Sequence, residues 1–194
     1  RLHYVESGNE GPLIVLLHGF PEYWYSWRHQ LPALAAAGFR VVAPDMRGYA
    51  QSESPTGIAN YHLDLLAQDI VELVAHLGVD KAHIVGHDWG AVVAWHIAMW
   101  HPNTINRLAI LNVPHPKTFE KALFRSPRQL LKSWYVFAFQ LPWLPEIVFR
   151  AGNCFALRQV LRHDPVRPDA FSDADIATYA AVFSDLATIR SGIH

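Results

Sequence analysis

Short apolar runs recur through the first part of the chain, at residues 12–17, 39–43, 82–86 and 107–111. Such runs predict strands that are covered on both faces of a sheet, because these strands have no polar side. Residues 2–7 instead alternate apolar and polar positions and end at a glycine, which predicts one further strand.

Helical spacing of apolar residues fills the stretches between these runs, at 27–37, 63–77 and 91–100. Gly38 and Gly78 follow the first two stretches, where a glycine commonly ends a helix. Strands that alternate with helices of this length predict an α/β fold, with a mostly parallel sheet flanked by helices.

The pattern changes after Asn112, where the residues VPHP at 113–116 end the alternation. From Lys117 onward the sequence predicts only helix and loop. We therefore expect a sheet domain at 1–114 and a separate, mostly helical part at 115–194.

Composition narrows the class of protein. A hydrophobic content of 51% and a net charge of -1 do not favour a disordered chain. Residues 117–167 are rich in Lys and Arg, but no run of adjacent cations occurs, which favours solvated helix faces over a nucleic-acid surface. Cys154 is the single cysteine, which suits a reducing, cytoplasmic location. No apolar stretch reaches the roughly 20 residues of a membrane span.

A sharp turn from strand to helix is predicted at 85–91, VGHDWGA. Asp88 lies between Gly86 and Gly90, and this Gly-x-Asp-x-Gly has the form of a nucleophile elbow with Asp in place of Ser. A carboxylate is ionised at neutral pH without a neighbouring base. It can attack carbon, displace a leaving group and form an ester on the protein. The alternative is that Asp88 only caps the helix that follows.

The loop HGFP at 18–21 follows the strand predicted at 12–17. An elbow fold takes one oxyanion donor from the residue after the nucleophile and another from such a loop. Here the donors would be the backbone N–H groups of Trp89 and Phe20. The residues expected to shape the two turns are His18, Gly19, Pro21, Gly86 and Gly90. Asp45 and Arg47 are expected to brace the loop after the strand at 39–43.

Two long segments carry a family resemblance: HGFPEYWYSWRHQLPALAAAGFRVVAPDMRGYAQS at 18–52 and GHDWGAVVAWHIAMWHP at 86–102. Together they resemble the soluble epoxide hydrolases of the α/β-hydrolase fold, and the resemblance extends over essentially the whole chain. Each motif alone is shared with haloalkane dehalogenases. Ala50 departs from the pattern, because many relatives have Gly there, and we expect the change to alter only a turn.

The resemblance implies that epoxides are opened to vicinal diols through an alkyl ester on Asp88. It also implies that 115–194 is part of a lid domain, in which Tyr135 protonates the epoxide oxygen. Trp134 and Phe139 would line the substrate site together with Phe20 and Trp89. No cofactor and no metal are implied. The partners would be a small apolar epoxide and water, without nucleic acid.

The resemblance further implies parts that this chain does not contain. None of the 12 histidines occupies the position of the general base, and Asn112 is the polar residue nearest to where its acid partner could stand. His18 and His87 belong to the turn motifs, the second lid tyrosine would follow His194, and Tyr179 is expected to pack between helices. We therefore expect a fragment that lacks the family's first strand and C-terminal third, able to form the ester but not to hydrolyse it.

Two other functions stay open at this point. A haloalkane dehalogenase would use the same Asp88 and Trp89, but it commonly has a second halide donor, Trp or Asn, where Phe20 stands. It also needs no acid such as Tyr135. A non-catalytic small-molecule binder is the remaining alternative, because hydrolase folds also serve as receptors.

Overall fold

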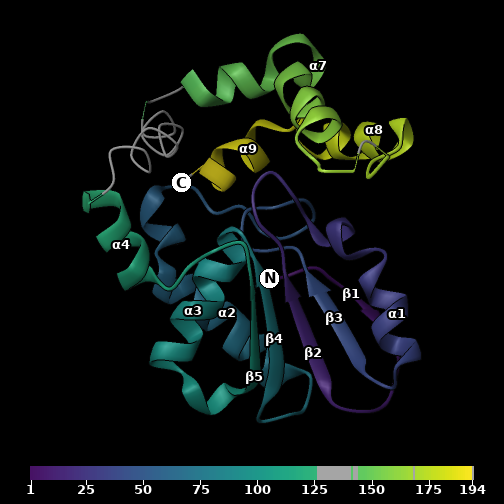
Figure 1. Cartoon of the computed structure of the whole chain (residues 1–194), viewed down its shortest axis with the longest axis vertical. Helices are drawn as coiled ribbons and strands as arrows, with labels where there is room; N and C mark the ends of the chain where they lie inside the picture. Colours follow the sequence, from purple (N-terminus) through teal and green to yellow (C-terminus); the bar gives the residue numbers. More distant parts are fainter. Residues whose placement is uncertain (126–140, 142–143, 168, 194) are drawn as a thin grey trace. The chain divides into compact units, whose positions relative to one another are not determined.

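The computed structural model describes residues 1–125, 141, 144–167 and 169–193 (Figure 1). The chain divides into two compact units, Arg1–Phe119 and Glu120–His194. The predicted division after residue 114 falls a few residues before the observed one.

A five-stranded sheet forms the centre of the first unit, in the order β1-β3-β2-β4-β5. Only β1 is antiparallel to its neighbour β3, and the other pairs are parallel. The strands are β1 (Tyr4–Ser7), β2 (Leu13–Leu17), β3 (Arg40–Pro44), β4 (Ala82–His87) and β5 (Ile105–Leu111). The predicted α/β fold with a mostly parallel sheet is confirmed.

Helices connect the strands of this unit: η1 (Trp24–Trp27), α1 (Gln30–Ala36), η2 (Ile58–Tyr61), α2 (Leu63–His76), α3 (Trp89–Trp100) and η3 (Pro102–Thr104). α4 (Pro116–Arg125) follows β5 and includes the division between the two units. The helix predicted over 27–37 is found as α1 over Gln30–Ala36, and it begins three residues later than predicted because a turn breaks the helical residues after η1. Pro32 explains the break, since a proline ring clashes with the carbonyl four residues earlier and cannot stand inside a longer α-helix. α3 begins at Trp89, two residues earlier than predicted.

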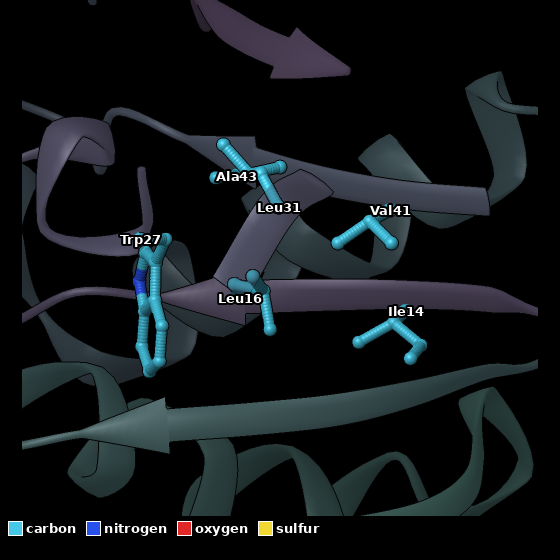
Figure 2. Close-up of a cluster of buried hydrophobic side chains, with 6 residues drawn as sticks. All are labelled: Ile14, Leu16, Trp27, Leu31, Val41 and Ala43. Carbon is cyan, nitrogen blue, oxygen red and sulfur yellow. The ribbon is translucent and has the colours of Figure 1, made fainter. Parts of the chain in front are cut away.

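The core of the first unit surrounds β2, whose five residues are all buried. Figure 2 shows Ile14 and Leu16 of β2 in one cluster with Val41 and Ala43 of β3, and Leu31 of α1 and Trp27 of η1 complete it. Alternate residues of a strand point to opposite faces, so the other β2 side chains face the far side of the sheet. α3 contacts β2, β4 and β5. The sheet is thus covered on both faces and can hold a site only at its edge.

The second unit is helical in the residues described, with α7 (Leu144–His163), α8 (Asp173–Val182) and α9 (Leu186–Ile193). α7 contains a kink at Ala151–Cys154, where the backbone leaves the helical region. The residues Leu157, Tyr179, Phe183 and Ile189 are fully buried. Tyr179 packs its ring edge-to-face with that of Phe171, so its expected packing role is confirmed. None of the described helices combines the length and apolarity needed to cross a bilayer.

Candidate active site

The parallel pairing of β2 with β4 brings two sequence motifs to one edge of the sheet (Figure 1). Leu17 pairs with Gly86, so the loop after β2 and the turn after β4 begin at the same level. Ligand sites of open α/β sheets gather at this carboxyl edge. The pairing therefore joins the HGFP loop to Asp88, although 68 residues separate Phe20 from Asp88.

Asp88 has the backbone of a strained elbow, with φ 51° and ψ -123°. A side chain rarely adopts such a conformation, which costs of order 1–3 kcal/mol and often marks a functional site. The two flanking glycines make the turn possible. A Cβ on Gly86 would lie 2.6 Å from the Cα of Ala91, and one on Gly90 would lie 2.6 Å from the carbonyl carbon of Leu17. No residue larger than glycine fits either place.

The side chain of Asp88 points back toward the HGFP loop. Its Oδ1 accepts a hydrogen bond from the backbone N–H of Phe20 at 3.0 Å. Gly19 permits this approach, because a Cβ there would lie 2.8 Å from the Cγ of Asp88. Asp88 stands at the N-cap of α3 but makes no side-chain capping bond. The alternative that its carboxylate caps the helix is therefore wrong.

Trp89 is the first residue of α3. The first N–H groups of a helix have no acceptor within it, so the Trp89 amide is available to an anion beside Asp88. The helix dipole also favours negative charge at this end. The Trp89 side chain is 48% exposed.

His18 is buried and uses both ring nitrogens within the scaffold. Its Nδ1–H donates to the carbonyl of Gly19 at 2.9 Å, and its Nε2 accepts from the N–H of Met46 at 2.9 Å. Burial lowers the pKa of His18 below its ordinary value, although nearby carboxylates oppose the effect. The neutral ring thus ties the HGFP loop to the loop after β3.

Glu22 is a residue of the site that the sequence reasoning missed. Its Oε2 accepts from Nδ1 of His87 at 3.1 Å, and both side chains are partly buried. Burial raises the pKa of Glu22, but the hydrogen bond and charge of His87 outweigh it and hold that pKa below its ordinary value. The same hydrogen bond raises the pKa of His87, against the effect of burial. The available signal was an acidic residue directly after HGFP, three positions from Gly19.

The loop after β3 is held as predicted for Asp45 and Arg47. Asp45 is fully buried and accepts from the ring of His3 at 2.7 Å and the N–H of Trp24 at 3.0 Å. Arg47 makes two hydrogen bonds to Asp69, at 2.7 and 2.6 Å. Ala50 lies in the left-handed region with φ 46°, which explains the glycine expected there.

Three predicted site residues, Trp134, Tyr135 and Phe139, lie outside the described residues, and their roles stay predictions. Within the part of the chain that is described, no group of three or more His, Cys, Asp or Glu side chains could hold a metal ion.

Comparison with known proteins agrees with this geometry. A family described as the alpha/beta hydrolase fold matches residues 12–146. The chain belongs to this family. Among solved structures, it resembles an epoxide hydrolase of Bacillus megaterium in complex with an inhibitor, with a TM-score of 0.88 and 33% identity over 98% of this chain and 68% of that one. The epoxide hydrolase VrEH1 of Vigna radiata gives a TM-score of 0.81 and 34% identity over 99% of this α/β-hydrolase chain and 67% of its own.

The curated relatives of this α/β-hydrolase point the same way. Epoxide hydrolase 4 of Homo sapiens is 40% identical over the whole chain. The AB hydrolase superfamily protein YfhM of Bacillus subtilis is 44% identical over 92% of it. The predicted resemblance to epoxide hydrolases is confirmed. The chain spans 55% of the human relative and 62% of the bacterial one, so it matches little more than half their length.

Proposed function

We propose that this protein opens epoxides, with Asp88 as the nucleophile that forms a covalent alkyl ester. The observation that carries the proposal is the hydrogen bond from the Phe20 amide to Oδ1 of Asp88. A carboxylate that only capped a helix would face the amides of its own first turn. This one instead faces a donor from another loop, with a strained backbone that presents it at the sheet edge.

In the proposed step, Oδ2 of Asp88 attacks one epoxide carbon and the bond from that carbon to the ring oxygen breaks. The electron pair of that bond goes to the oxygen, which takes a proton from an acid of the lid. We assign Tyr135 to that role, because a phenol is neutral at neutral pH and can donate to a developing alkoxide. The products are a neutral ester with its alcohol still bound and the phenolate of Tyr135.

Oδ1 becomes the carbonyl oxygen of that ester. Attack of water on the ester carbon would place negative charge on the same oxygen, which the amides of Phe20 and Trp89 would stabilise. Losing one such donor typically costs about 2.7–4 kcal/mol of barrier. No residue of the chain is assigned as the base that activates this water.

The named activity of the similar proteins supports epoxides as the substrate class. Phe20 stands where a dehalogenase commonly has a second halide donor, which favours an epoxide over a haloalkane. We infer a small apolar substrate, lined by Phe20 and Trp89 and by the lid residues Trp134 and Phe139. We also infer that no cofactor takes part and that the protein is cytoplasmic.

The test is the intact mass of the protein after incubation with styrene oxide and an acid quench, beside an Asp88→Ala variant. We expect an adduct of one substrate mass on the wild type, mapped to Asp88 in the peptide digest, and none on the variant. Circular dichroism of both proteins controls for folding. A folded wild type without an adduct would contradict the proposal.

A matched haloalkane, phenethyl bromide, separates the two chemistries that Asp88 allows. An adduct with the bromide but not the epoxide would favour dehalogenation. Binding of styrene glycol without an adduct from either reagent would favour a non-catalytic binder.

A further inference from the structure

A chain of hydrogen bonds crosses the carboxyl edge of the sheet beside Asp88. Glu22 follows β2, His87 ends β4 and Asn112 follows β5, and these three strands are neighbours in the sheet. Nδ1 of His87 lies 3.1 Å from Oε2 of Glu22, and Nε2 lies 3.2 Å from the amide nitrogen of Asn112. The imidazole thus joins two strand ends that are not adjacent to each other.

The partners define which nitrogen carries a proton. A carboxylate only accepts, so Nδ1 of His87 carries the hydrogen that faces Glu22. In the neutral ring, Nε2 accepts from the amide nitrogen of Asn112, which lies within hydrogen-bonding distance. In the charged ring, Nε2–H needs an acceptor, and Asn112 provides one when its amide turns over to present the oxygen. An asparagine therefore serves both charge states, whereas a carboxylate would serve only the cation.

Asn112 is held in place by an unusual backbone. Its φ is 66°, in the left-handed region that asparagine tolerates better than most residues. This backbone sets the direction in which the side chain leaves the main chain at the end of β5.

The hydrogen-bonded residues Glu22, His87 and Asn112 are connected to the proposed nucleophile Asp88 by two routes. His87 directly precedes Asp88. Glu22 donates its backbone N–H to the carbonyl of Gly19 at 3.1 Å, and Gly19 precedes the Phe20 amide that holds Asp88. Among the described residues, the charged groups that act on His87 are Glu22 and Asp88. A change in the charge or orientation of the ring therefore reaches both the carboxylate and its amide donor.

We propose that Asn112 is a positioning residue for Asp88: its amide orients the His87 ring toward Glu22 and leaves the charge of that ring to be set by Glu22. The inference rests on the proposed alkylation by Asp88, but the first part of its test requires no chemistry. Two substitutions suit the backbone of Asn112, because aspartate and glycine both adopt positive φ.

The first measurement is the titration of His87 followed by NMR of the imidazole in the wild type, Asn112→Asp and Asn112→Gly. A second carboxylate at Nε2 stabilises the cation, so we expect the His87 titration to move to higher pH in Asn112→Asp. In Asn112→Gly, water takes over both roles of the amide, so we expect little movement of the titration but a broadened Nδ1–H signal. An unchanged titration in folded Asn112→Asp would overturn the inference.

The second measurement is the rate of adduct formation with styrene oxide against pH in the same three proteins. We expect the inflection of the rate to move upward with the His87 titration in Asn112→Asp, and the rate to fall in Asn112→Gly without a shift of the inflection. In Asn112→Asp, a purely structural role of Asn112 would lower the rate evenly at every pH without moving the inflection, and that result would overturn the inference. Absence of any adduct on the wild type would instead contradict the proposed function, while the NMR titration would still test Asn112.

Discussion

Gly19→Ala tests the closest approach in the site, between the HGFP loop and the carboxylate of Asp88. The new Cβ would lie 2.8 Å from Cγ of Asp88 and closer still to its Cβ and Oδ1. Carbon atoms prefer a separation of about 3.5–4.0 Å, so the carboxylate or the loop must move by about 1 Å. That movement breaks the geometry of the bond from the Phe20 amide, which now measures 3.0 Å.

A misplacement of about 1 Å can cost on the order of 100-fold in rate. At about 1.4 kcal/mol for each factor of ten, this corresponds to about 2.7 kcal/mol of barrier. Overpacking should also lower the free energy of unfolding by about 1–3 kcal/mol. We therefore expect Gly19→Ala to fold with reduced stability and to form the styrene oxide adduct about 100-fold more slowly.

Gly38→Ala is the matched control for this substitution. Gly38 has φ 88°, and a Cβ there would meet nothing within 4 Å. Its replacement costs only backbone strain, about 1–2 kcal/mol, at a position away from the site. The assay is the rate of adduct formation by quenched intact mass, with urea unfolding measured on each protein. A folded Gly19→Ala protein that reacts at the wild-type rate would refute the placement of Asp88 against Gly19.

Three further predictions concern stability. Glu22→Gln removes the charged partner of His87. Because that partner raises the pKa of His87, the pair stabilises the fold at low pH, and this stabilisation is lost as pH rises through the raised pKa. Because the pKa of Glu22 is lowered, its ionised form stabilises the fold above about pH 4.5, and this stabilisation is lost below that pH. Both groups are charged between about pH 4.5 and 6.5, so the free energy of unfolding in urea should differ most from wild type there, by about 1–2 kcal/mol. A difference that grows above pH 7 would contradict the sign. Ala50→Gly relieves a left-handed φ that costs about 1–2 kcal/mol, and the greater entropy of the unfolded chain with glycine opposes this by about 0.4–1 kcal/mol. We therefore expect a small rise in Tm by calorimetry, and a fall in Tm would contradict the strain argument. Ser172→Ala removes the capping box with Asp175 at the start of α8 and should cost about 0.5–2 kcal/mol by thermal unfolding, whereas an unchanged Tm would mean that the exposed box contributes little.

Local pattern was sufficient for most elements of the sheet domain. The buried strand at 12–17, the amphipathic helix at 63–77 and the turn at Asp88 all follow from residues within a few positions of one another. For the helix predicted at 27–37, pattern placed the start three residues too early, because helical spacing of apolar residues persists across a break that Pro32 imposes. Spacing alone does not register a missing N–H and a ring clash, so the prediction extended α1 back to the last residue of η1.

The candidate site divides in the same way. The Gly-x-Asp-x-Gly turn and the HGFP loop are local motifs, and the form of the elbow already predicted the amide of Phe20 as an oxyanion donor beside Asp88. The roles of Glu22 and Asn112 were not anticipated, because each meets His87 only through the side-by-side pairing of β2, β4 and β5.

What the sequence by itself determined is the set of elements and the identity of the carboxylate on the turn, because periodicity and glycine positions act over short distances. What only the tertiary structure decided is which side chains meet. Strand order β1-β3-β2-β4-β5 is not the order of the chain, and it brings residues up to 68 positions apart within hydrogen-bonding distance. Hydrogen bonds depend on separations of about 3 Å and on direction. Such separations arise only when distant strands are paired in register, which the spacing of residues along one strand cannot specify.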